Sequence, residues 1–105
     1  MKINTEELER EYGKAKSFCG KILLDKKNSE LKLVKVSKKA AYPTHQHLNK
    51  TEFIFVLEGN PTITIGEKEY DSKKGEFFNL PHPLNHAIEN KSDQNECLFL
   101  VATKE

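Results

Sequence analysis

The feature that most constrains the fold is a series of short strand-like segments that begins after residue 20. Residues Thr62–Ile65 alternate polar and apolar side chains, which indicates a strand with one buried face. Phe53–Leu57 is apolar throughout, as expected where both faces are covered. Turn formers such as those in Glu58–Pro61 separate the segments. Evenly spaced short strands predict an all-β sandwich or barrel. The predicted strands are Lys21–Leu24, Leu31–Ser37, Thr44–Leu48, Glu52–Leu57, Thr62–Ile65, Lys68–Tyr70, Phe77–Asn79, His86–Glu89 and Cys97–Thr103.

The N-terminal residues have a different pattern, which predicts a short helix over residues 4–12. Asn4 is a suitable N-cap, Glu7 lies three residues later as in a capping box, and Gly13 provides a stop. A chain of 105 residues predicts a single domain. We therefore expect a helix and lead-in at 1–20, packed on a β-barrel formed by 21–105.

Charge and hydropathy exclude several classes of protein. Seventeen basic and sixteen acidic residues give a net charge of +1, and the lysines are scattered instead of forming the basic stripe of a nucleic-acid-binding face. No apolar run is long enough for a membrane span. The first thirteen residues lack the apolar core of a secretory signal. We expect a cytoplasmic protein with Cys19 and Cys97 as reduced thiols.

All four histidines lie between residues 45 and 86. On a strand, His45 and His47 point to the same face with Cα atoms about 6.8 Å apart, so both imidazoles can converge on one point. Glu52 and His86 can reach that point from other strands. Three imidazoles and one carboxylate suit Fe, Mn, Co, Ni, Cu or Zn. Taken singly, each residue has an ordinary alternative: solvent-facing histidines, a surface carboxylate and a hydrogen-bonded turn histidine.

Two motifs resemble those of the cupin superfamily. The first is His45-Gln46-His47, four residues, Glu52, six residues, Gly59; the second is Gly75, five residues, Pro81, then His86, three residues, Asn90. The fifteen residues between the two motif glycines are similar to the spacer of small microbial cupins. Two turn glycines of the family are replaced, by Lys39 and by Pro83. The loop Pro81–Asn85 is therefore expected to differ from the family norm.

The resemblance implies a cupin double-stranded β-helix, a jelly-roll-like barrel, with His45, His47, Glu52 and His86 as ligands of one divalent transition metal ion. It implies a metal-dependent enzyme acting on a small organic molecule, as a dioxygenase, isomerase or decarboxylase. A non-catalytic module that binds or senses a small ligand or metal is the alternative, and a purely structural metal is a third. An open cavity beside the metal would favour the first over the third.

Three further residues lie near the predicted ligands or within the motifs without being ligands themselves. His82, the histidine outside the motifs, is either a surface turn residue or an acid–base group at the barrel mouth. Tyr42 is near the histidine pair and matches no motif position. Asn90 matches the second motif, and we expect it to make structural hydrogen bonds instead of binding metal.

The strand Glu52–Leu57 also predicts how the barrel faces its surroundings. If Glu52 points inward, Ile54 and Val56 do so too, whereas Phe53, Phe55 and Leu57 face outward. Outward aromatic area of this kind favours a homodimer, because a symmetric partner would cover it.

Overall fold

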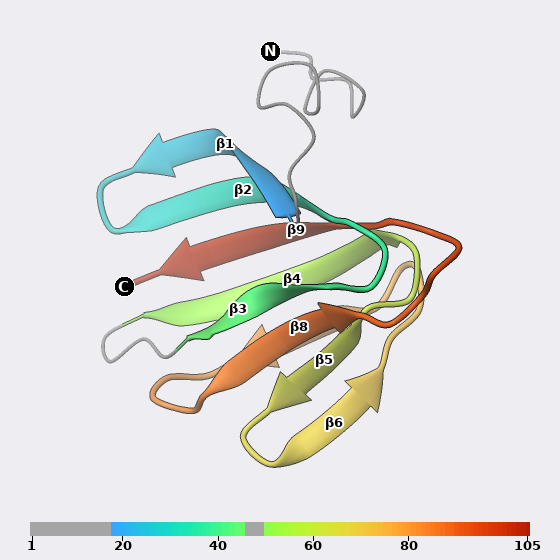
Figure 1. Cartoon of the computed structure of the whole chain (residues 1–105). Coiled ribbons are helices and arrows are strands. Elements are labelled where there is room, and N and C mark those ends of the chain that lie inside the picture. The colour runs from blue at the N-terminus through green and yellow to red at the C-terminus, as the bar shows by residue number, and fades with distance from the viewer. Residues whose placement is uncertain (1–17, 46–49) are drawn as a thin grey trace.

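The structure is a computed structural model that describes residues 18–45 and 50–105. The helix expected at residues 4–12 lies outside the described residues, so it and the boundary at residue 20 stay predictions. Within the described ranges there is no helix, and so none long and apolar enough to cross a membrane. The same ranges form nine strands (Figure 1): β1 Phe18–Lys26, β2 Ser29–Val36, β3 Ala40–His45, β4 Thr51–Glu58, β5 Thr62–Ile65, β6 Lys68–Asp71, β7 Phe77–Leu80, β8 His86–Asn90 and β9 Cys97–Lys104.

The strands form two antiparallel sheets that face each other (Figure 1). One sheet has five strands in the order β1-β2-β9-β4-β7, and the other has four in the order β3-β8-β5-β6. The last strand, β9, lies in the middle of the larger sheet between β2 and β4, so the C-terminal segment holds together strands distant in sequence. The predicted all-β, jelly-roll-like barrel is confirmed.

The side chains of β4 alternate as predicted. Ile54 and Val56 are fully buried between the sheets, together with Glu52, whereas Phe53, Phe55 and Leu57 face outward with partial exposure. Ile54 and Val56 belong to one core cluster formed by both sheets. Full burial of a side chain of this size contributes roughly 1.5–3 kcal/mol relative to an exposed position. The cluster comprises Val34, Val36, Ile54, Val56, Ile63, Leu80, Ile88, Cys97, Phe99 and Val101.

A second apolar cluster lies on the outer face of the larger sheet. Its buried members are Cys19, Leu33 and Leu98, with Leu23, Leu57 and Leu100 packed against them. Cys97 belongs to the inner cluster instead. Both cysteines are buried, and no disulfide joins them.

The third strand begins four residues earlier than predicted and is described as far as His45, so its predicted end at Leu48 lies outside the described residues. Pro43 explains the difference at the start of the strand. A proline cannot donate a hydrogen bond to a sheet ladder, so its presence argues against a strand in the sequence. Here it lies in β3, an edge strand, between Tyr42 and His45, where the pairing with β8 shifts register. An edge position and a register shift are the two places where a strand accepts proline.

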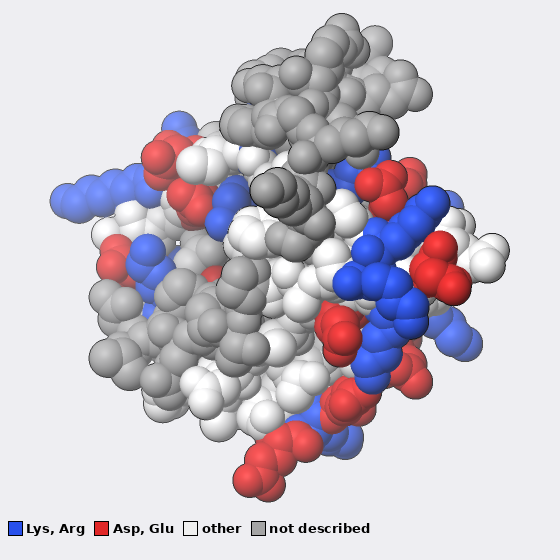
Figure 2. Space-filling view, in the orientation of Figure 1, with Lys and Arg blue, Asp and Glu red and all other residues white. Residues whose placement is uncertain are grey.

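Charged side chains are mixed in sign over the visible surface. Figure 2 shows lysine and acidic side chains alternating along the right-hand edge of the molecule, around a central region of uncharged residues. Lys91 Nζ and Glu69 Oε1, 2.7 Å apart on exposed side chains, form a surface ion pair.

Candidate functional site

Glu52 and His86 meet in the interior of the barrel. Glu52 is the second residue of β4 in the larger sheet, and His86 is the first residue of β8 in the smaller sheet. Both side chains point between the sheets because strand alternation turns every second residue inward. Glu52 Oε2 and His86 Nε2 are 3.2 Å apart, with both side chains buried. The two sequence motifs thus supply two polar groups that touch across the barrel.

His45 is brought to the same region by backbone pairing. It is the last residue of β3, and its Cα is registered directly opposite that of His86 on β8. The side chain of His45 and the whole of His47 lie outside the described residues. Among the side chains that are described, no three histidine, cysteine or acidic groups gather as a metal site.

The Glu52–His86 pair fits the geometry of two ligands on one ion. Carboxylate and imidazole ligands lie about 2.0–2.2 Å from a zinc-sized ion, so two of them at a right angle are about 3.0 Å apart. The 3.2 Å contact is close to that value. An imidazole and a carboxylate also form part of the donor set that transition metals accept.

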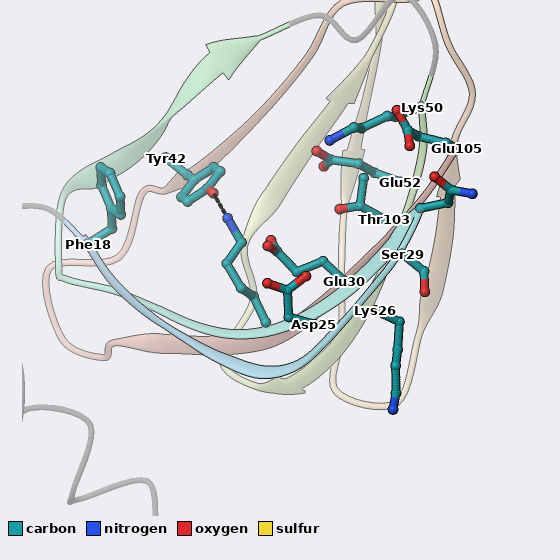
Figure 3. Close-up of a pocket in the computed structure, with 12 residues that line it drawn as sticks. Phe18, Asp25, Lys26, Ser29, Glu30, Tyr42, Lys50, Glu52, Thr103 and Glu105 are labelled. Carbon is teal, nitrogen blue, oxygen red and sulfur yellow. Dashed lines mark hydrogen bonds between the residues drawn. The ribbon is translucent and has the colours of Figure 1, made fainter.

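A cavity of about 540 Å³ opens beside Glu52 at one end of the barrel. This is within the usual range for small-molecule sites. Figure 3 shows Glu52 and Thr103 together at one side of the cavity, with Tyr42 and Phe18 on the opposite wall. The lining residues are Phe18, Asp25, Lys26, Asn28, Ser29, Glu30, Lys32, Tyr42, Lys50, Glu52, Thr103 and Glu105.

A row of polar residues crosses the inner face of the larger sheet at this cavity. Asp25 on β1 pairs with Glu30 on β2, Glu30 with Thr103 on β9, and Thr103 with Glu52 on β4. Lys32, one inward position deeper on β2, donates a hydrogen bond of 3.2 Å from Nζ to Tyr42 Oη. Sequence motifs did not identify Glu30, Lys32 or Thr103, because none of them is a motif position.

His82 lies apart from these groups. It is exposed in the loop that joins β7 to β8, and it is not among the residues that line the cavity. The His82–Pro83 peptide bond is cis. The acid–base role of His82 stays a prediction.

The opposite end of the barrel is closed by hydrogen bonds and apolar packing. The buried amide of Asn90 donates to the backbone oxygens of Ser37 and Asn95 over 3.1 and 2.9 Å. The expected structural role of Asn90 is confirmed. Burial also raises the pKa of the nearby Cys97 thiol to about 11. That thiol is a core group and not a nucleophile at neutral pH.

Several solved structures share this architecture. The TT1209 protein of Thermus thermophilus matches with a TM-score of 0.85 and 22% identity, over 99% of this chain and 97% of that chain. A predicted oxalate decarboxylase of Thermotoga maritima matches with a TM-score of 0.78 and 20% identity, over 83% and 79%. A sugar phosphate isomerase of Silicibacter pomeroyi matches with a TM-score of 0.74 and 21% identity, over 85% and 60%. At these identities the likeness shows the fold.

Sequence comparison adds one relative and a family. An uncharacterized protein of Methanocaldococcus jannaschii is 33% identical over 46 residues, which are 44% of this chain and 37% of that protein. This chain thus matches well under half the length of that relative. The family model of the cupin domain matches residues 32–103, which include both motifs and every strand from β3 to β8, with most of β2 and β9. The chain therefore belongs to the cupin family.

Proposed function

We propose that the protein is a metal-dependent enzyme acting on a small organic molecule, with one divalent transition metal ion held by His45, His47, Glu52 and His86. The contact between Glu52 and His86 carries the proposal. A buried carboxylate and a buried imidazole, supplied by two separate motifs on two separate sheets, are the groups that a bound cation would stabilise.

Backbone register supports the other two ligands. Directly opposed residues of an antiparallel pair share a face of the sheet. His45 is opposed to His86, so the proposal puts its imidazole on the side of His86. His47, two residues further along an extended chain, would share that side.

The cavity beside Glu52 favours a catalytic or ligand-binding role over a purely structural metal. A structural ion needs a closed site, whereas a catalytic ion keeps a position open to small molecules. Here Glu52 is on the wall of a cavity of about 540 Å³. When bound, the ion would supply Lewis acidity that polarises an oxygen of the substrate. The predicted decarboxylase and the isomerase named among the similar structures indicate two reaction types to be tested, and a dioxygenase reaction is the third.

Metal analysis of purified variants tests the proposal. We expect about one ion per wild-type chain, and loss of affinity by more than about 100-fold in His86→Ala and Glu52→Ala, since even outer-shell changes cost 10–100-fold. His82→Ala is the matched control: its metal content should equal that of the wild type, while turnover changes if His82 acts in acid–base catalysis. Equal metal occupancy in wild type and His86→Ala would remove His86 from the site and refute the proposal.

We also propose that a second copy of the chain covers the outer face of the larger sheet. Leu33, Leu100, Phe55 and Phe77 form one cross-strand row over β2, β9, β4 and β7. Phe55 is 39% exposed and Phe77 60% exposed. An apolar sheet face can pair with its own copy about a two-fold axis, and a net charge of +1 adds little repulsion between copies.

Light scattering at micromolar concentration should give the mass of a dimer. Phe77→Glu should shift the population to monomer, because it would bury a carboxylate without a partner. Leu84→Glu, at an exposed apolar residue in the loop before β8, is the control and should leave the dimer intact. A wild-type monomer would refute the proposal, and a dimer that survives Phe77→Glu would place the interface elsewhere. If deletion of residues 1–17 converts a monomer to a dimer, that segment and not a second copy covers the face.

A further inference from the structure

Lys32 is a lysine on the inner face of the barrel. Its neighbours at the inward positions of β2 are Glu30 and Val34, and its register partner on β9 is the buried Val101. A partly buried ammonium group requires polar partners. Tyr42 provides one: its Oη accepts a hydrogen bond from Lys32 Nζ, which also lies 5.9 Å from the centre of the tyrosine ring.

Tyr42 is held in place by aromatic packing. Its ring is edge-on to Phe18, with centroids 4.8 Å apart, and edge-on to Phe99 at 6.3 Å. The phenol oxygen is therefore a fixed acceptor for Lys32 Nζ, and the dashed line at Tyr42 in Figure 3 marks this hydrogen bond.

The tyrosine is neutral, so it does not balance the lysine charge. Asp25 and Glu30 line the same cavity, yet within residues 18–45 and 50–105 no carboxylate forms an ion pair with Lys32. A partly buried cation that faces a cavity and forms no ion pair with the described carboxylates around it is suited to an anionic ligand.

We propose that Lys32 binds the carboxylate of a short-chain hydroxy or oxo acid, and that Tyr42 positions Lys32 for this contact. The inference rests on the proposed function, because the oxygen at the far end of the same molecule would reach the site of Glu52 and His86. Lys32 is an anchoring residue for the substrate, and Tyr42 acts through Lys32.

Sheet geometry sets the length of the ligand. Lys32 and Glu52 are two strands apart, across β9, and one inward position apart along the strands. With strands about 4.8 Å apart and alternate residues about 6.8 Å apart, their Cα atoms are separated by about 12 Å. Lys32 Nζ is held at Tyr42, on the cavity wall opposite Glu52, so the space between the ammonium group and the carboxylate has room for a molecule of a few carbon atoms.

The other polar groups narrow the chemistry further. Thr103 lies between the two residues on β9, and Glu30 is beside it, so both can accept hydrogen bonds from hydroxyl groups. The cavity is also lined by four carboxylates, those of Asp25, Glu30, Glu52 and Glu105. A second negative charge on the ligand would be repelled, which selects a monocarboxylate over a dicarboxylate or a phosphate dianion.

Lactate and its neutral analogue lactamide test the inference in chelator-treated, metal-free protein. Saturable binding of lactate, followed through amide chemical shifts near the cavity, is expected for the wild type. Lys32→Met should weaken it about 10- to 100-fold, the range for a lost hydrogen bond to a charged group. Lys74→Met, at an exposed lysine in the loop before β7 that does not line the cavity, is the matched control and should bind lactate as the wild type does. Inorganic phosphate and lactamide should each bind the wild type at least about 10-fold more weakly than lactate does.

Tyr42→Phe keeps the ring and removes the hydrogen-bond acceptor. It should reduce lactate affinity by less than Lys32→Met does and reduce the ratio of lactate affinity to lactamide affinity. Thermal stability should fall only by the amount expected for one lost hydrogen bond. Equal binding of lactate and lactamide to the wild type, or equal lactate binding to wild type and Lys32→Met, would overturn the inference. If Lys32→Met does not fold, the lactate–lactamide comparison on the wild type decides it alone. Failure to bind metal would refute the proposed function, whereas Lys32-dependent lactate binding would survive that failure.

Discussion

The two ends of the barrel are formed by the same strands but differ in the side chains that these strands turn inward. At the end beside the β1–β2 turn, on the left in Figure 1, the inward residues are polar: Glu30 and Lys32 on β2, Glu52 on β4, His86 on β8 and Thr103 on β9. At the other end the same strands carry Val34, Val36, Val56, Ile88, Asn90, Cys97 and Phe99, all buried.

Within each strand, the residues at the closed end of the barrel contribute to stability, whereas those at the open end line the cavity. Apolar side chains at the closed end fill the space between the sheets, and Asn90 satisfies the backbone oxygens of the loops there. The open end cannot be filled in this way, because it keeps a cavity lined by charged groups. We expect substitutions at the closed end to change stability and substitutions at the open end to change ligand or metal binding.

The largest expected effect is at Phe99, which is fully buried at the closed end. Phe99→Ala should lower the free energy of unfolding by about 3–5 kcal/mol, because it removes a large apolar side chain and leaves a cavity. Thr103→Ala, on the same face of the same strand at the open end, should cost less than about 1 kcal/mol. Urea denaturation of the two variants measures both values. Equal losses would show that the open end is as important to stability as the closed end.

Cys97 gives a smaller effect that depends on pH. Burial raises its pKa to about 11 from an ordinary value of 9.0, so the thiol ionises in the unfolded chain before it does in the folded protein. Stability from this group is complete below pH 9 and is lost as pH rises from 9 to 11, by about 2–3 kcal/mol in all. Cys97→Ala lacks this loss. The difference in unfolding free energy between wild type and variant should therefore shrink between pH 8 and pH 11, and a constant difference would contradict the raised pKa.

Much of the closed end could be predicted from sequence, because apolar alternation and turn residues carry the signal. The outward and inward faces of β4 follow from the alternation that begins at Glu52, and the turn at Gly59 follows from its motif position. Gly59 has a φ of +81°, and a Cβ there would lie 2.8 Å from the Cβ of Cys97, so only glycine fits. At this turn the motif pattern and the packing against Cys97 both require glycine.

The open end was less predictable, because motif positions identify groups of proposed ligands but not the walls of the cavity around them. Strand β2 is the clearest example. Alternation alone would turn Leu31 and Leu33 inward, but the structure turns Glu30 and Lys32 inward and packs Leu33 into the outer cluster. The sheet has apolar side chains on both faces, so hydrophobicity does not fix which face is inside. The choice is made by the pairing of β2 with β9, which joins residues about seventy positions apart.

The smallest expected effect compares two left-handed backbone positions, one at each end of the barrel. Lys39 at the closed end has a φ of 53°, and Asn28 at the open end has a φ of 72°. Lysine is strained in this region, whereas asparagine tolerates it. Lys39 also replaces the glycine that many cupins have at the start of the first motif, and its backbone N–H donates to the oxygen of Ser92 over 2.9 Å, which keeps the turn in place.

Lys39→Gly should therefore raise the free energy of unfolding by about 0.5 kcal/mol, since relief of about 1–2 kcal/mol of strain is partly offset by the greater entropy of glycine in the unfolded chain. Asn28→Gly has less strain to relieve and should be neutral or slightly destabilising. Chemical denaturation of both variants, with metal content measured alongside, tests the pair. If Asn28→Gly raises the free energy of unfolding as much as Lys39→Gly does, the identity of the side chain does not determine the backbone strain at these positions. If metal content changes in Lys39→Gly but not in Asn28→Gly, the closed end influences the proposed metal site. That result would contradict the assignment of stability to the closed end and binding to the open end.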